Sequence, residues 1–332
     1  MQKNLVGTQY TYSFDFVLPD EKEMRNDDLG LLFHGKCQQT GASVIVRYIR
    51  NKQLIKSTQH LQLVRQIFLG LNKIHQGIVQ TYDCLIDEDG LYFIREELIG
   101  ADLQQIAFSG DYPHLRNQKF ILKVGSKVCE ILTELHRNKI INRRIQPSNI
   151  FLVANDLGQI DVDNPTVKLL NLEYAQINGQ NILGFQTIPY AKYYSSPEQV
   201  LQCGVLVNET SDIYSLGMTL NESISREHVF DSEKDDNNLI LNTQVSFPLH
   251  RHHRVDKKVF PLLLKATSKH IFKTPPMRYN KDSRLRYFWN AQKMRYQSAS
   301  EMQQALDALI QELPDEIENK ILTKFKSIFR RS

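Results

Sequence analysis

The chain has 332 residues, a net charge of +4 and 41% hydrophobic residues, a balance typical of a globular protein with an apolar core. It has no run of about 18 apolar residues that would predict a membrane-spanning helix, and its start lacks a signal-peptide pattern. Its four cysteines show no C-x-x-C spacing, so we expect reduced thiols in the cytoplasm rather than bound zinc.

The first third of the chain predicts a small sheet and one helix. Apolar and aromatic patterns over 10–18, 29–38 and 43–49 predict three strands. Apolar residues recur on one helical face over 57–74. The loop 19–28, between the first two strands, contains five acidic residues, which would repel a bound phosphate group or simply form a solvated loop.

The remainder predicts a mainly helical unit. Helical apolar stripes occur over 118–136, 212–225 and 298–313. The polar segment 155–164 predicts an enlarged turn between two strands, and the charged segment 231–238 predicts a loop.

The segment from Ile140 to Leu152 resembles the catalytic loop of the protein kinases. The family pattern is H-R-D-L-x-x-x-N, in which the Asp orients the attacking hydroxyl and the Asn holds magnesium. Here the His and Asp positions are Asn142 and Arg144, whereas the Asn is retained as Asn149. An arginine cannot act as a base at neutral pH, because its guanidinium stays protonated.

Other motifs of the same family follow in the correct order. They are 44–47 for V-A-I-K, 75–79 for H-P-N-I-V, 167–173 for the strand into D-F-G, 196–199 for the end of the activation segment, 211–217 for the start of helix F and 295–302 for a closing motif like that of bacterial Ser/Thr kinases. The resemblance implies a two-lobe α+β fold. It predicts a small N-lobe with an antiparallel sheet and helix C over 1–97, a larger mainly helical C-lobe over 98–312, and a basic amphipathic tail over 313–332.

The same resemblance implies that the positions responsible for phosphoryl transfer have changed. These positions are Arg47 for the strand lysine, Gln66 for its helix-C partner, Arg144 for the base, Gln146 for the loop lysine, Asn171 for the Asp of D-F-G and Glu173 for its Gly. Magnesium sites usually include a carboxylate. Glu173 and Asp161 are the only nearby candidates, so we expect no bound metal and no cofactor.

The resemblance also outlines a vestigial nucleotide cleft. Its members would be Arg47, Arg95 at the gatekeeper position, Glu96 at the hinge, Asn149 and Asn171. Arg95 would either occupy the back of the adenine pocket or extend into solvent, and we favour extension into solvent. Arg144 and Glu173 are predicted to form a salt bridge.

Three charged residues match structural anchors of the family. Glu198 and Arg295 match the ion pair that holds the activation segment on the large lobe, and Asp212 matches the buried aspartate beneath the catalytic loop. A buried charge that keeps its partner is costly to separate, so these residues point to a retained fold.

Two surfaces are candidates for partner binding. Between Arg251 and Arg295, 13 Lys or Arg residues stand against two acids, which predicts a docking face for an acidic protein or a solvated basic face. Its members are Arg251, Arg254, Lys257, Lys258, Arg284, Arg286 and Trp289. Nucleic acid is the less favoured partner, and the three histidines at 250, 252 and 253 do not complete a metal site. The tail would lie on a membrane surface, in a partner's groove or on its own lobe.

These patterns together predict a catalytically inactive pseudokinase, not an enzyme, that acts as a cytoplasmic scaffold or allosteric regulator for a protein partner. The first alternative is a divergent nucleotide-binding, kinase-like transferase with residual or altered phosphotransfer activity. The second is a peripheral membrane adaptor that uses the tail.

Overall fold

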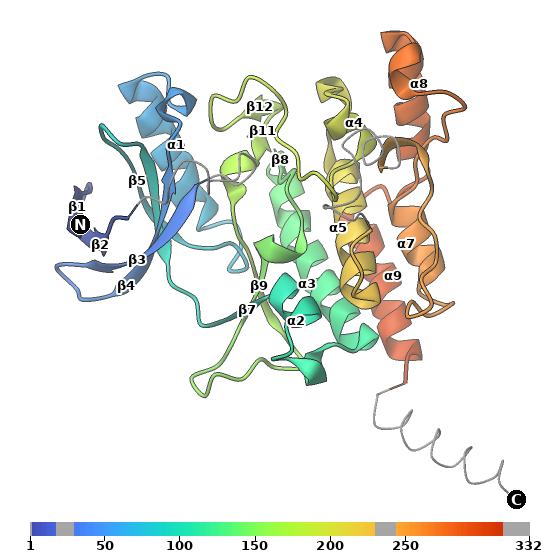
Figure 1. The fold of residues 1–332 in the computed structure, drawn as a ribbon, viewed down its shortest axis with the longest axis horizontal. Coiled ribbons are helices and arrows are strands. Elements are labelled where there is room, and N and C mark those ends of the chain that lie inside the picture. Colours follow the sequence, from blue (N-terminus) through green and yellow to red (C-terminus); the bar gives the residue numbers. More distant parts are fainter. Residues whose placement is uncertain (1, 18–29, 230–243, 315–332) are drawn as a thin grey trace, which may run out of the picture. The chain divides into compact units, whose positions relative to one another are not determined.

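The structure, a computed structural model, describes residues 2–17, 30–229 and 244–314 (Figure 1). The chain forms two compact units, one of residues 1–99 with 180–186 and the other of residues 100–179 with 187–332. The predicted α+β architecture, with a small antiparallel-sheet unit and a larger helical unit, is confirmed. The acidic loop, the charged loop 231–238 and residues 315–332 of the tail lie outside the described residues.

The first unit is built on one antiparallel sheet in the order β1-β2-β3-β4-β6-β5. Its strands are β1 (Gln2–Val6), β2 (Thr11–Asp15), β3 (Leu31–Cys37), β4 (Ser43–Ile49), β5 (Thr81–Ile86) and β6 (Leu91–Glu96). The short β12 (Gln180–Asn181) and the 3-10 turn Lys52–Leu54 also belong to this unit. Alternate side chains of the strands form a buried core that includes Phe14, Val46 and Tyr92.

The sheet is rolled, so that its first and last strands approach each other. The turn after β1 meets β5, where the backbone N–H of Thr8 donates to Asp83 at 2.7 Å. At the opposite end of β1, Lys3 pairs with Asp87 at 2.7 Å and with Asp89. β1 therefore closes the sheet, although the sequence patterns did not predict this strand.

Helix α1 (Thr58–Leu71) packs on the sheet of the first unit. Ser57 caps its N-terminus by accepting a hydrogen bond from the backbone of His60. Val64 and Phe68 are buried on its inner face, and the Phe68 ring lies 4.8 Å from that of Phe93 on β6.

The second unit is mainly helical. Its helices are α2 (Leu103–Phe108), α3 (Gln118–Arg137), α4 (Pro197–Val200), α5 (Glu209–Ser225), α7 (Phe260–Ala266), α8 (Lys281–Gln292) and α9 (Ala299–Glu312). Its strands are β7 (Gly100–Asp102), β8 (Ile140–Ile141), β9 (Ile150–Val153), β10 (Thr166–Leu169) and β11 (Gln176–Ile177). Short 3-10 turns cover Pro113–Leu115, Pro147–Asn149, Leu172–Tyr174, Gly204–Leu206 and Pro276–Arg278. No helix among the described residues is long and apolar enough to cross a membrane.

Helix α5 lies at the centre of this unit and contacts α3, α7 and α9 (Figure 1). Glycines allow the close approach on two sides. A Cβ on Gly125 of α3 would lie 2.8 Å from Leu220 of α5, and a Cβ on Gly217 of α5 would lie 2.9 Å from Ala266 of α7. The buried α5 positions the loop that follows α3, where the predicted site lies.

Candidate functional site

Asp212 fixes the loop that follows α3. It lies in the first turn of α5, and its side chain is fully buried. Its carboxylate accepts hydrogen bonds from the backbone N–H groups of Asn142 (2.8 Å) and Arg143 (2.7 Å) and lies 2.9 Å from Nε2 of His136. A buried carboxylate is costly without such partners, and the N-terminal end of α5 also favours its negative charge. The start of the loop is therefore held mainly through its backbone N–H groups, and the side chain of Asn142 accepts a further hydrogen bond from the backbone N–H of Arg144 at 3.0 Å.

Arg143 ties this loop to the segment after Asn171. Its backbone is left-handed, with φ of 65°, and its side chain is buried. Its guanidinium donates to the carbonyl oxygens of Tyr174 (2.7 Å) and Ala175 (3.1 Å), while its own carbonyl accepts from Gln199 (3.0 Å). Burial lowers the pKa of Arg143 to about 10, and Asp212 opposes this effect, so the group is still charged at neutral pH.

Asn149 and Asn171 lie in direct contact. Asn149 donates to the carbonyl oxygen of Arg144 at 2.9 Å, and its side-chain oxygen accepts from Asn171 at 2.6 Å. Asn171 adopts a left-handed backbone conformation (φ 62°, ψ 46°), which Asn tolerates better than most residues. Asn149 thus braces the loop.

This pair does not fit a magnesium ion. Magnesium requires hard oxygen ligands and is usually bound through at least one carboxylate. The amide oxygen of Asn149 already accepts a hydrogen bond from Asn171, and both groups are neutral. No step of the chemistry proposed below therefore passes through a metal ion at this position.

Arg144, at the base position, contacts an aromatic ring. Its guanidinium carbon lies 4.0 Å from the centroid of the Tyr174 ring, within the range of a cation–π interaction. Glu173, which precedes Tyr174, is buried. Its salt bridge with Arg144 stays a prediction. Gln146, at the loop-lysine position, donates to the hydroxyl of Ser148 at 2.9 Å.

The first unit holds the other predicted positions. Arg47 on β4 and Arg95 on β6 are both buried, so the prediction that Arg95 extends into solvent is wrong. Arg95 lies in the interior of the sheet rather than at its edge, because β6 is a central strand between β4 and β5. Glu96 accepts a hydrogen bond from the backbone of Gln80 at 2.7 Å, and Gln66 lies on an exposed face of α1.

Arg65, the neighbour of Gln66 on α1, makes a polar contact that the sequence did not reveal. Arg65 lies 2.8 Å from the buried carboxylate of Asp83 and donates to the carbonyl oxygen of Cys84 at 2.8 Å. This contact joins helix to sheet. An Arg beside the expected position and an Asp within an apolar strand were the signals for it.

A match to the protein kinase domain family covers residues 27–317. The chain belongs to the protein kinase family. It is 24% identical over 275 residues to "Serine/threonine-protein kinase D2" of Rattus norvegicus, a match over 82% of the chain and 29% of that relative.

Two further relatives are serine/threonine kinases by name. The chain is 29% identical over 207 residues to "Serine/threonine-protein kinase Nek2" of Mus musculus, over 58% of the chain and 44% of the relative. It is 25% identical over 290 residues to "Probable serine/threonine-protein kinase nek2" of Dictyostelium discoideum, over 86% of the chain and 65% of the relative. The kinase-like chain therefore spans less than two thirds of the length of these relatives.

These findings overturn one prediction and leave another without support. The family and the names of the relatives contradict the prediction that the chain is not an enzyme. That prediction relied too much on the absence of the base and the metal ligands, and too little on the retained loop. The resemblance to bacterial kinases in particular is not supported, because the relatives above come from Rattus norvegicus, Mus musculus and Dictyostelium discoideum.

The predicted kinase anchors Glu198 and Arg295 lie together in the second unit. Both side chains are fully buried, and the guanidinium contacts the carboxylate through two hydrogen bonds of 2.7 and 3.1 Å. Gln292 and Ser211 donate to the same carboxylate at 3.0 and 2.8 Å. Burial alone would raise the pKa of Glu198, but Arg295 and Gln292 outweigh it and hold that pKa below its usual value.

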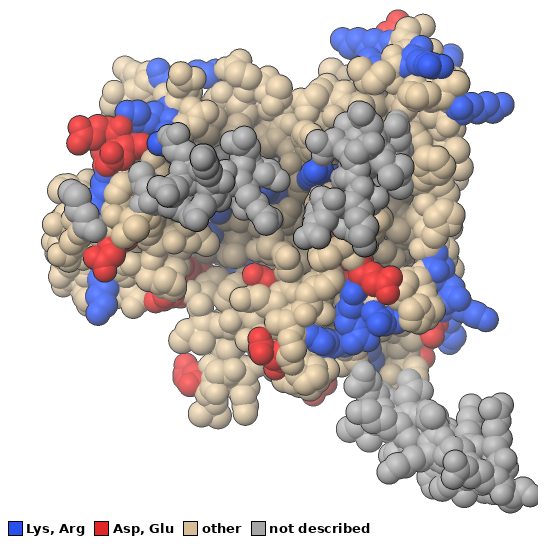
Figure 2. All heavy atoms as spheres, viewed as in Figure 1, with Lys and Arg blue, Asp and Glu red and all other residues tan. Residues whose placement is uncertain are grey.

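The predicted basic surface is divided between two places. Figure 2 shows the basic side chains gathered over α8 and, separately, near the end of α9. Arg284, Arg286 and Trp289 lie on α8. Arg251, Arg254, Lys257 and Lys258 precede α7, and Lys258 lies 3.4 Å from Glu312 at the end of α9. A single docking face is therefore not formed, and a protein partner at either group stays a prediction.

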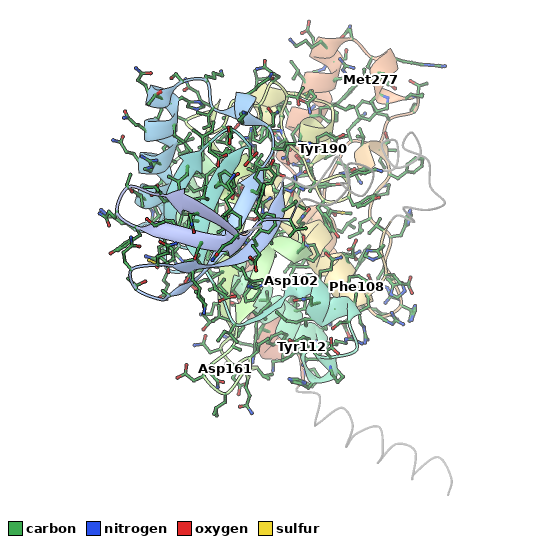
Figure 3. All side chains as sticks on the ribbon, turned by 60° about the vertical axis from the view of Figure 1, so that its left-hand side comes forward. Asp102, Phe108, Tyr112, Asp161, Tyr190 and Met277 are labelled. Carbon is green, nitrogen blue, oxygen red and sulfur yellow. The ribbon has the colours of Figure 1, made fainter. Side chains whose placement is uncertain are left out.

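Asp161 is a turn residue. Figure 3 shows it at the outer edge of the second unit, on the connection between β9 and β10. It accepts hydrogen bonds from the backbone of Asp163 and Asn164, which lower its pKa. Within the described ranges, no three His, Cys, Asp or Glu side chains gather as a metal site would require.

Proposed function

We propose that this chain is a divergent nucleotide-binding, kinase-like transferase with residual or altered phosphotransfer activity. The observation that carries the proposal is the catalytic loop, which Asp212, Arg143 and Asn149 hold through backbone contacts. Phosphoryl transfer in this family passes through a loose transition state, and catalysis is mainly positioning and charge stabilisation. A loop that keeps its position therefore supports transfer even where its base has changed.

Arg144 contributes positive charge in place of the base. A guanidinium presents paired N–H donors whose geometry matches phosphate oxygens, and it neutralises negative charge on a phosphoryl group. The Tyr174 ring, 4.0 Å away, restricts the positions that this guanidinium can take. In the first unit, Arg47 keeps a permanent positive charge at the sequence position of the strand lysine. The proton of the acceptor hydroxyl would leave to solvent or to the phosphate rather than to Arg144.

Nucleotide binding is the first property to test. The full chain should show a thermal shift with ATP in EDTA, because Arg144 rather than a metal site would hold the phosphates. At about 100 times its dissociation constant, a ligand stabilises the fold by roughly 2.7 kcal/mol. Arg144→Gln should reduce this shift. Arg137→Gln is the matched control, because Arg137 is an exposed residue at the end of α3 that pairs with Glu134.

Transfer is then measured with γ-labelled ATP and the full chain, both as self-modification and on a general protein acceptor. Label transfer above the Arg144→Gln background supports the proposal. Absence of both a thermal shift at millimolar ATP and label transfer, with EDTA and with magnesium, would refute it.

A further inference from the structure

The rolled sheet of the first unit is open at one end. Three segments surround this open end, which we call the mouth. They are the turn between β1 and β2, the turn between β3 and β4, and the start of β5. A cavity of about 470 Å³ occupies the mouth, and side chains from these segments and from the end of α1 line it. This volume lies within the range of small-molecule sites, which often occupy the mouths of rolled or closed sheets.

The cavity has a deep apolar floor and an exposed rim. Tyr12, Cys37 and Val44 form the floor, with exposures of 3%, 4% and 1%, and belong to the core of the rolled sheet. Tyr10 and Tyr82 on the rim are 40% and 38% exposed. Aromatic rings at a rim favour the stacking of another ring.

The lining of the cavity is uncharged. It consists of hydroxyl, amide, thiol and apolar side chains, without Lys, Arg, Asp or Glu. The carboxylate of Asp83, which follows the lining residue Tyr82 on β5, is already engaged by Thr8, which donates at 2.7 and 2.9 Å, and by Arg65 at 2.8 Å. A charged ligand would lose its hydration without gaining a partner charge, so the site selects against charge.

The wall of the cavity is fixed before any ligand enters. Asn72, which caps the C-terminus of α1, donates to the carbonyl oxygen of Thr81 at 2.7 Å and accepts from its N–H at 2.9 Å. These two bonds join the end of α1 to β5. A preformed site avoids the ordering cost that binding otherwise carries.

We propose that this cavity binds a small, neutral, ring-containing molecule that carries a hydroxyl, amine or carbonyl group. The apolar floor receives the ring, and the hydroxyl and amide groups of the lining, such as those of Thr40 and Gln80, meet the polar group. The site is made by the β1–β2 and β3–β4 turns, the start of β5 and the end of α1. It is independent of the catalytic loop and of the function proposed above.

Cys37 provides a reporter within the cavity. Burial opposes ionisation of its thiol, but hydrogen bonds from Thr40 and Gln39 outweigh it and lower its pKa. Cys203 lies in the second unit, and burial raises its pKa. Alkylation by iodoacetamide, read by mass spectrometry, can therefore be followed separately at the two thiols.

The test uses two probes with the same ring system and the full chain. N-phenyl-1-naphthylamine is neutral and has one N–H donor, whereas 8-anilinonaphthalene-1-sulfonate adds a negative charge. The neutral probe should give saturable fluorescence and, at about ten times its dissociation constant, slow the alkylation of Cys37 about tenfold by mass action. Alkylation of Cys203 should not change. The sulfonate should bind this site at least about tenfold more weakly.

A matched pair of variants on α1 locates the binding. Leu69 lies on the rim and is 40% exposed, so Leu69→Asp should weaken the neutral probe about tenfold. Leu63 is also exposed on α1 but does not line the cavity, and Leu63→Asp should leave binding unchanged. Equal binding of the two probes, or equal effects of the two variants on the fluorescence titration, would overturn the proposal even if Cys37 proved unreactive.

Discussion

Glu198→Gln should strongly destabilise the second unit. The substitution keeps the size of the side chain but removes the charge that faces Arg295, at 2.7 and 3.1 Å in a fully buried site. Removing one member of a buried ion pair leaves the other charge without compensation and costs about 3–5 kcal/mol. The replacement amide also presents an NH₂ group toward the donors of Gln292 and Ser211, so we expect a loss in the upper half of this range.

The single tryptophan of the chain makes the assay specific. Trp289 lies on α8, one turn before Gln292, so its fluorescence reports the unfolding of the second unit. Urea titrations followed by this signal compare the free energy of unfolding of the variant with that of the unchanged chain. The difference is read from the shift in midpoint at constant slope.

The matched control is Glu312→Gln. Glu312 pairs with Lys258 at 3.4 Å, and both side chains are 60% exposed, so its substitution should cost less than about 1 kcal/mol. The depressed pKa of Glu198 adds a pH signature. Its ionised form stabilises the fold fully above the unfolded pKa of about 4.5, and this contribution is lost as pH falls toward the lower folded pKa. Similar losses in the two variants would refute the argument that burial sets the cost.

Three further predictions concern single side chains. Asp212→Asn replaces an acceptor with an NH₂ group and should cost about 1–3 kcal/mol, seen as faster hydrogen exchange at the start of the catalytic loop. Burial lowers the pKa of Lys269 to about 7 from 10.5. Between these two pH values the lysine is therefore protonated in the unfolded chain and neutral in the folded chain. Stability should therefore rise by about 2 kcal/mol from pH 7 to 9, and Lys269→Met should abolish that rise in urea titrations. Asn171→Asp places a carboxylate beside Asn149, so magnesium should increase the thermal shift with ATP in this variant and not in the unchanged chain.

Regular periodicity in the sequence predicted the large elements well. The helix expected over 118–136 is α3 (Gln118–Arg137), and the strand expected over 43–49 is β4 (Ser43–Ile49). In both elements, apolar residues recur at the constant spacing that is needed to bury one or two faces of the element. Strand β1 (Gln2–Val6) was missed because three of its five residues are polar and only Leu5 is buried. It is stabilised by distant contacts with β5 and with the turn that follows β5, which no local pattern reveals.

The contacts of the candidate site were harder to predict than its positions. The family motifs located Asp212 and Asn149, and both lie at the catalytic loop. They did not indicate that His136, at the end of α3, approaches Asp212, because that contact depends on how α3 meets α5. The burial of Arg95 was missed for a similar reason, since a strand sequence does not specify which side chains its neighbours cover.

In the catalytic loop, most of the contacts that fix the backbone do not involve the side chain at the base position. Asp212 accepts hydrogen bonds from backbone N–H groups at positions 142 and 143, and Asn149 donates to the backbone carbonyl of Arg144. Every residue other than proline offers these same backbone groups, so these supports do not depend on the side chain of Arg144. Asn142 adds a side-chain support, because its amide oxygen accepts a hydrogen bond from the backbone N–H of Arg144 at 3.0 Å. This explains how Arg144 occupies a kinase-like loop without loss of the backbone supports. It also means that a missing catalytic side chain is weak evidence that the surrounding site has lost its function.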